Sequence, residues 1–232
     1  MKLADVLREP GATPPDDPAQ LALSYRNLRK CVGVVGLALP TVLLLAHLVG
    51  FVPGDLPGSI SAFYYTRMGA YFVGSLCALG VFLFSYRYAK RDNWLSNVAS
   101  VFVIFVALCP TASDTGPHNV WNILHLVAAF SFFAVVAVFS GFLFTRKPGQ
   151  PHWWERWRLP WAVGTAEDRR DWVYRVCALL IGLSLLAAVV VERFGGHILF
   201  WGESVAVLAF SFSWLVKGQF RWLWQWVVFP DP

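Results

Sequence analysis

Polar side chains that could bind a ligand or transfer a proton are few in this apolar chain, and they fall in a small number of segments. His125 and Glu203 each stand inside a long apolar run, where ionisable groups are rare. Imidazole and carboxylate groups serve as general acids and bases and as metal ligands. With nearby hydroxyl, phenol and amide groups they predict one polar ligand cavity. Its candidate residues are His47, Ser59, Ser61, Tyr64, Asp114, His118, Asn122, His125, His197 and Glu203.

Six apolar runs must position these groups. They cover about 32–52, 68–86, 94–109, 120–144, 172–191 and 198–215. Each is near the roughly 20 residues that cross a hydrocarbon core, with the third and sixth short. Only helices and closed barrels satisfy their backbone polar groups in lipid, and these runs are too long and too continuously apolar for barrel strands. The sequence therefore predicts an all-α polytopic integral membrane protein, a bundle of six transmembrane helices.

Basic residues divide unequally between the two sides of such a bundle. All Lys and Arg residues except Arg67 and Arg193 lie in the N-terminal segment 1–30, the second and fourth loops, or the tail. By the positive-inside rule both termini face the cytoplasm. The expected organisation is a cytoplasmic segment 1–30, a transmembrane domain 31–218 whose cytoplasmic loop 146–171 is rich in Trp and Arg, and an interfacial cytoplasmic tail 219–232.

This orientation puts four histidines on the outer side, together with Asp114 and Glu203. At a rise of about 1.5 Å per residue, Glu203 and His125 lie near the same depth in the bundle. A carboxylate facing lipid costs several kcal/mol, so we expect Glu203 to point inward and to pair with His125 or His47. An interhelical hydrogen bond with a purely structural role is the alternative. The turn-rich first loop (residues 53–61) could cover this cavity as a lid, although Ser59 and Ser61 are also typical helix-capping residues.

An enzymatic alternative stays open. An outer-leaflet lipid hydrolase or transferase would use His125 as general base and Glu203 to orient it, with Asp114 or His118 as an auxiliary group. Zinc is possible, with His47, His118, His125 and Glu203 as weak ligand candidates; no other cofactor is expected. The set is similar to that of the alkaline ceramidase and progestin/adiponectin receptor hydrolases. Their HxxxH pair and seventh span are absent, so their zinc is not carried over. A small-molecule transporter is a second alternative.

The basic, tryptophan-rich segments point to the membrane surface. Trp and Arg alternate in the fourth loop and again in the tail, a composition typical of the headgroup region. Because the basic residues flank membrane spans, the isoelectric point near 9.2 does not indicate nucleic acid binding. Membrane lipids are the expected partners. A homo-oligomer, and a cytoplasmic partner at the Trp-rich loop, stay open.

Several short blocks between residues 25 and 218 carry a family resemblance. They are Leu37–Pro40, Ser59–Tyr65, Cys109–Pro110, Leu124–Phe133 and Trp201–Gly218. They resemble a widespread group of bacterial six-span membrane proteins, similar in layout to the DRAM/Sfk-like superfamily. The resemblance implies a six-helix bundle with a polar outer mouth at the position of His125, and no established catalytic residues. We therefore expect a multi-pass protein of the bacterial inner (plasma) membrane that binds a lipid headgroup or small amphiphile, in lipid homeostasis or sensing.

Overall fold

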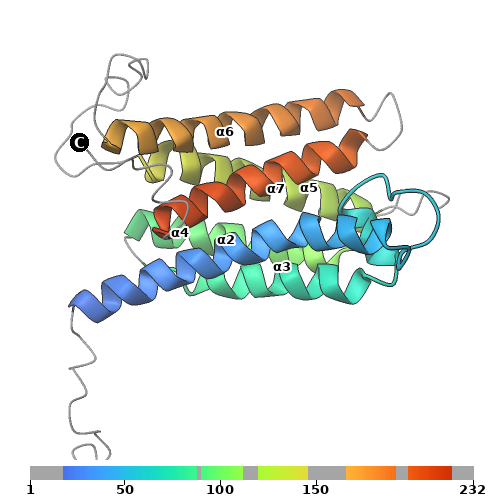
Figure 1. Ribbon diagram of the computed structural model, residues 1–232, viewed down its shortest axis with the longest axis horizontal. Coiled ribbons are helices and arrows are strands. Elements are labelled where there is room, and N and C mark those ends of the chain that lie inside the picture. The colour runs from blue at the N-terminus through green and yellow to red at the C-terminus, as the bar shows by residue number, and fades with distance from the viewer. Residues whose placement is uncertain (1–17, 88–89, 112–119, 146–165, 192–197, 221–232) are drawn as a thin grey trace, which may run out of the picture.

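The chain folds into a bundle of long antiparallel helices. The computed structural model describes residues 18–87, 90–111, 120–145, 166–191 and 198–220. Within these ranges the long helices are α2 (Pro18–Leu48), α3 (Gly69–Phe84), α4 (Lys90–Leu108), α5 (Val120–Val138), α6 (Ala166–Val191) and α7 (Ile198–Lys217). A short 3₁₀ helix, η1 (Ser61–Tyr65), precedes α3, and a π-helical turn, η2 (Phe139–Leu143), continues α5. Successive helices run in opposite directions along the long axis of the bundle (Figure 1).

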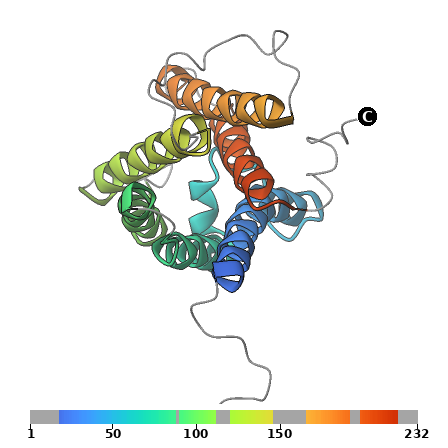
Figure 2. The ribbon, with the colours of Figure 1, turned by 90° about the vertical axis from the view of Figure 1, so that its left-hand side faces the viewer.

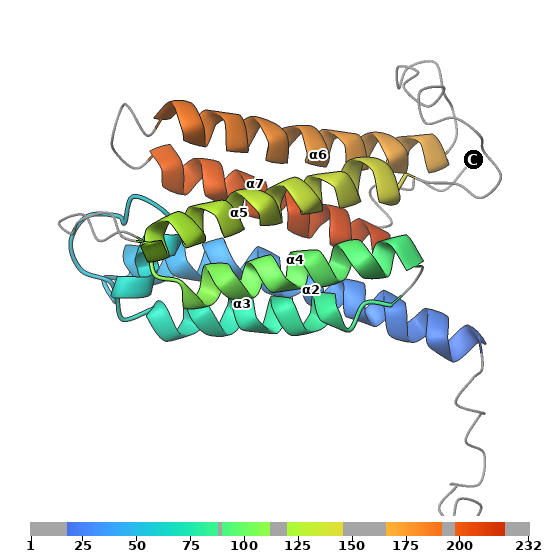
Figure 3. The same cartoon turned by 180° about the vertical axis from the view of Figure 1, so that it is seen from behind.

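Helices that follow one another in sequence also pack side by side. Viewed along the bundle, they form a ring that closes where α7 packs against α2, and η1 lies inside that ring (Figure 2). On the face shown in Figure 3, α5 lies between α4 and α6. Helix α6 packs against both α5 and α7, whereas α5 and α7 touch each other little. Helix α6 therefore connects α5 to α7, which have few direct contacts with each other.

Four of the described helices are long and apolar enough to cross a membrane. The segments are Leu23–Leu48, Val120–Leu143, Asp168–Ala188 and Ile198–Lys217. Two further apolar helices, Gly69–Phe84 and Asp92–Leu108, are shorter. A helix of 16 residues such as α3 reaches about 24 Å, less than the roughly 30 Å of a hydrocarbon core. The all-α prediction is confirmed, and the four longer helices indicate a multi-pass membrane protein.

The lengths of individual helices differ from the sequence expectation. The expectation of a short helix is confirmed for the third run and wrong for the sixth, and the second run also forms a short helix. The second run loses its start because η1 and a turn precede Gly69, and Gly69 packs closely on the backbone of Tyr64. The sixth run extends to Lys217 and reaches 20 residues. The tryptophans of the fourth loop and of the tail lie outside the described residues.

A buried aromatic cluster lies at the end of the bundle opposite η1. The indole of Trp214 is fully buried, and its ring is within 6 Å, centroid to centroid, of four aromatic rings: Tyr86, Phe139, Phe144 and Phe210. Beside this cluster the Arg29 guanidinium donates to the Tyr86 hydroxyl, with the shorter bond at 2.6 Å. Lys217 Nζ donates to the Phe144 carbonyl oxygen at 2.7 Å. Aromatic contacts and the hydrogen bonds of Arg29 and Lys217 thus join α2, the segment after α3, η2 and α7.

Helices α2 and α7 approach closely because α2 presents glycines to α7. A Cβ added at Gly33 would lie 2.5 Å from Leu215 Cγ and 3.0 Å from the Leu215 backbone nitrogen. Gly36 similarly faces the Ser211 hydroxyl. Small residues at such an interface let the helix backbones come together, which is how membrane helices gain packing energy without a hydrophobic driving force between them.

Substituting alanine for Gly33 is expected to destabilise the fold by about 1–3 kcal/mol, because the added methyl group overlaps buried Leu215. The matched control is Gly74→Ala in α3, where an added Cβ meets nothing within 4 Å. That control is expected to stabilise the fold by up to about 1 kcal/mol through helix propensity. Unfolding in detergent, followed by circular dichroism, measures both. Equal shifts of the same sign would contradict this account of the α2–α7 contact.

Candidate functional site

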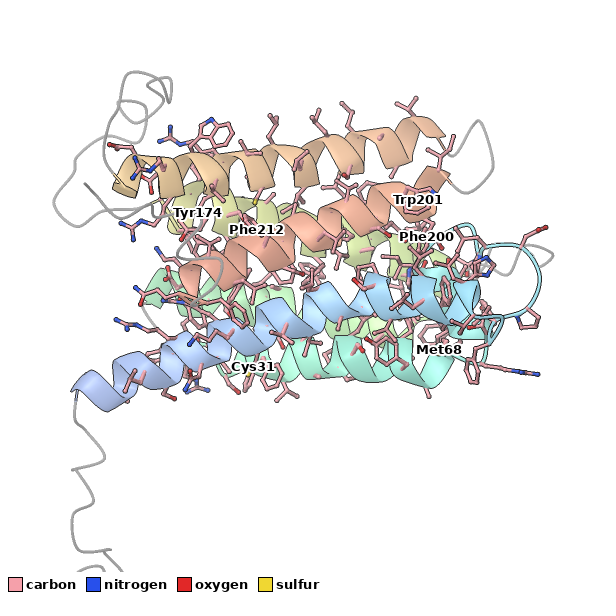
Figure 4. The ribbon with its side chains drawn as sticks, in the orientation of Figure 1. Cys31, Met68, Tyr174, Phe200, Trp201 and Phe212 are labelled. Atoms are coloured by element: carbon pink, nitrogen blue, oxygen red, sulfur yellow. The ribbon has the colours of Figure 1, made fainter. Side chains whose placement is uncertain are left out.

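A cavity of about 190 Å³ lies between α5, α6 and α7, at the end of the bundle where the first loop packs. On α5 it is lined by His125, Ala129 and Phe133, spaced four residues apart and so on one helical face. On α7 it is lined by Leu199, Gly202, Glu203 and Ala206. The third side comes from Ser184, Leu185 and Ala188 of α6, and Ser59, Ser61 and Thr111 close the end. In Figure 4, Phe200 and Trp201 mark this end of α7, and Tyr174 marks the opposite end of the bundle.

A second, smaller cavity of about 50 Å³ lies further inside the bundle. The two cavities share part of their lining, namely Ser61, His125, Ala129, Phe133 and Glu203. The inner cavity is otherwise lined by apolar side chains such as Leu39, Phe72 and Val103. His125 and Glu203 therefore lie where the larger cavity meets the inner one.

The carboxylate of Glu203 holds the first loop. Its Oε2 accepts a hydrogen bond from the Ile60 backbone N–H at 2.6 Å. One turn earlier in α7, the Phe200 N–H donates to the Gly58 carbonyl oxygen at 2.8 Å. Both bonds satisfy N–H groups that the starts of helices leave unpaired, since Ile60 precedes η1 and Phe200 lies in the first turn of α7. Helix α7 thus holds the first loop, which follows α2, in place.

The imidazole of His125 binds the end of α4. Its Nδ1 lies 2.8 Å from the Cys109 carbonyl oxygen, and because a carbonyl can only accept, Nδ1 carries the proton. Helix α4 ends at Leu108 and Pro110 has no N–H, so the last carbonyl groups of α4 need partners from elsewhere. His125 supplies one of them and is itself buried.

The predicted pairing of Glu203 with His125 or His47 is not what the structure has. Glu203 and His125 line the same cavity, but each binds backbone groups, and no hydrogen bond or ion pair joins them within the described part of the chain. His47 lies in the last turn of α2 and does not line the cavity; its Nδ1 is buried without a hydrogen-bond partner there. The physical reason is that helix ends nearby leave backbone N–H and C=O groups without partners. Glu203 and His125 bind these groups instead of each other.

The other candidate residues divide into three groups. Ser59 and Ser61 line the cavity, and their hydroxyl oxygens lie 3.0 Å apart. Ser59 Oγ also accepts the Ala62 N–H, as a capping serine does. Tyr64 packs edge-on against Tyr65, and Asn122 is buried in α5, but neither lines the cavity. Asp114, His118 and His197 lie outside the described residues.

The described residues contain no group of three or more His, Cys, Asp or Glu side chains that could hold a metal ion. The weak zinc candidates His47, His125 and Glu203 therefore do not converge, and His118 lies outside the described ranges. The general-base geometry proposed for an enzyme is likewise absent between Glu203 and His125, because Glu203 binds the first loop instead.

Sequence reasoning missed the side of the cavity that α6 provides. Ser184, Leu185 and Ala188 belong to the part of α6 that follows Arg175, which contains no charged residue, so no charge pattern there marks the inward face of the helix. Gly202 was also missed. It lines the cavity, and a Cβ placed on it would meet nothing within 4 Å, so this glycine opens onto free space. Only the three-dimensional arrangement identifies these positions.

The fold defines a class: an all-α bundle with four helices able to cross a membrane among its described residues, and a partly polar cavity near one end. No protein-family model, curated protein or solved structure matches the chain.

Proposed function

We propose that this chain is a six-span protein of the bacterial inner membrane, with both termini in the cytoplasm, that binds a lipid headgroup or small amphiphile in the cavity between α5, α6 and α7. The observation that carries the proposal is the cavity lining: a polar end formed by Glu203, His125, Ser59 and Ser61, continued by apolar side chains of three helices. A molecule with one polar and one apolar end matches that lining.

The distribution of charge supports the orientation. Arg29 and Lys217 lie at the end of the bundle opposite the cavity, beside the aromatic cluster around Trp214. The described basic residue on the cavity side is Arg67, which is exposed and lies over the Phe51 ring. With the basic end in the cytoplasm, the cavity opens toward the outer half of the membrane.

The size and position of the cavity support a small ligand that enters from the lipid. Pockets for drug-sized molecules measure about 300–1,000 Å³, and this cavity holds about 190 Å³. That volume suits one headgroup or a segment of one chain. Leu126 of α5 and Leu185 of α6 line the cavity. The same two helices expose many apolar side chains on their outer faces, as lipid-facing helices do, so the cavity lies beside a surface suited to lipid.

The test is a cavity-filling substitution with a matched control. Gly202→Phe places a ring in the open space of the cavity, whereas Gly182→Phe places the same ring on the exposed side of α6, where an added Cβ also meets nothing within 4 Å. Native mass spectrometry of protein released from lipid nanodiscs should find a bound amphiphile on the wild-type chain and on Gly182→Phe. Gly202→Phe should lose it.

Two results would overturn the proposal. Equal occupancy in Gly202→Phe and Gly182→Phe would mean that the amphiphile sits elsewhere. A stoichiometric metal ion in the purified protein, together with release of a hydrolysed lipid, would instead favour the outer-leaflet hydrolase.

A further inference from the structure

We infer, on the basis of the binding function proposed above, that the cavity selects a single-chain amphiphile whose polar end is an ammonium or other N–H donor, and that it discriminates against a phosphate-ended one. The juxtaposition that carries this inference is a carboxylate, an imidazole and hydroxyl groups at the closed end of an otherwise apolar groove. The net charge of the whole chain is positive, but it does not determine which ligand the cavity binds.

The charge of the lining opposes the charge of the chain. Glu203 is the one acidic residue among the described lining residues, and no Lys or Arg is among them. Two basic side chains of the bundle bind groups far from the cavity. Arg29 binds the Tyr86 hydroxyl and Lys217 binds the Phe144 carbonyl, both at the far end of the bundle. A phosphate ligand usually requires Arg, Lys or several backbone N–H groups, and the described lining offers none of these cations.

The hydrogen-bonding capacity of the lining is mainly that of acceptors. Glu203 can accept about four hydrogen bonds, and the backbone N–H groups of Ile60 and Ser61 already use two of these positions. The His125 ring has two backbone partners, the carbonyl groups of Cys109 and Val106. With the proton on Nδ1, Nε2 of the neutral ring is an acceptor. The Thr111 carbonyl oxygen already accepts from the Tyr65 hydroxyl at 2.6 Å. A ligand therefore gains most from donors, and an ammonium group supplies three.

The apolar part of the lining limits the ligand to one chain. Leu126 and Phe130 of α5, Leu185 of α6 and Leu199 of α7 surround the remainder of the cavity. Phospholipids with two chains and a phosphate fit neither the volume of about 190 Å³ nor the charge. A primary amine carried on one alkyl chain fits both.

The experiment compares three probes with the same ten-carbon chain: decylammonium, decanol and decyl phosphate. Binding to wild-type protein in nanodiscs of zwitterionic lipid is measured by titration calorimetry, with Gly202→Phe nanodiscs titrated to subtract partition into lipid. Decylammonium should bind roughly tenfold tighter than decanol, as a hydrogen bond to a charged group implies. Decyl phosphate should bind more weakly than decanol.

Glu203→Gln tests whether the charge of the carboxylate causes the preference. Glutamine keeps an oxygen that can accept the Ile60 N–H, so the first loop stays in place while the charge is lost. In this variant the ratio of decylammonium affinity to decanol affinity should fall to no more than about threefold. If the variant does not fold, the wild-type series decides the question alone.

The outcomes separate this inference from the proposed function. Saturable binding of all three probes with equal affinity, or tightest binding of decyl phosphate, would overturn the ammonium preference while leaving an amphiphile site in place. No probe binding wild type beyond the Gly202→Phe background would overturn the proposed function itself.

Discussion

Replacement of Trp214 by alanine is expected to lower the free energy of unfolding by about 3–5 kcal/mol, the range for removal of a buried aromatic side chain. The indole is fully buried and touches aromatic rings from η2 and the residue after it, from α7 itself and from the segment after α3. Its removal leaves a void that those rings cannot all fill, because each is also packed against other neighbours. Equilibrium unfolding in mixed detergent micelles, followed by circular dichroism, measures the loss.

Two matched variants give this prediction its control. Trp201→Ala removes the same side chain from the same helix at a position that is 52% exposed. It should change the free energy of unfolding by no more than about 0.5 kcal/mol. Trp214→Phe keeps most of the packing and removes an indole N–H that has no hydrogen-bond partner among the described residues. Its cost should be well below that of alanine, since an unpaired buried donor is itself unfavourable. Equal losses from Trp201→Ala and Trp214→Ala would contradict the assignment of Trp214 to the core.

Substitution of leucine for Glu203 is expected to free the first loop. Leucine cannot accept the Ile60 N–H, and leaving that donor unpaired costs about 1–3 kcal/mol at a site where the bond measures 2.6 Å. Hydrogen exchange of the amides of residues 58–65, read by mass spectrometry, should accelerate by roughly 10–100-fold in this variant.

The control for the loop is the glutamine variant of the same residue. Glu203→Gln retains an acceptor for Ile60, so its exchange over residues 58–65 should stay within about threefold of wild type. Exchange in α6 should be unchanged in both variants, because α6 has no hydrogen bond to this loop among those found. If leucine and glutamine accelerate exchange alike, the charge of Glu203 rather than its hydrogen bond holds the loop.

The sequence predicted the helices well and the contacts of the site poorly, for a physical reason. Apolar runs set the positions of α5 and α7 to within a few residues, because a span must be long and continuously apolar. The position of α6 gave no information about which of its faces points inward. After Arg175 the helix is apolar on all sides, so no pattern separates its lipid face from the face that carries Ser184.

Sequence patterns also do not show which backbone group a polar side chain will bind. Residue types led us to expect Glu203 to bind a histidine, but its partner is the Ile60 N–H, a group that every residue except proline carries and no sequence pattern marks. The same holds for His125 and the Cys109 carbonyl, although the Cys109–Pro110 dipeptide does indicate a helix end with free carbonyl groups. That His125 and Glu203 lie on one cavity was expected from their depth alone.

The bonds between the first loop and α7 also set an order for the biosynthesis of the protein. Ile60 and Glu203 are 143 residues apart in the chain, and at about 5–20 residues per second a ribosome needs on the order of ten seconds to travel between them. During that time the Ile60 amide has no carboxylate to bind and η1 has no α7 to enclose it. The cavity can therefore form only when the last helix is inserted, so a chain truncated before α7 would reach the membrane with helices but without a site.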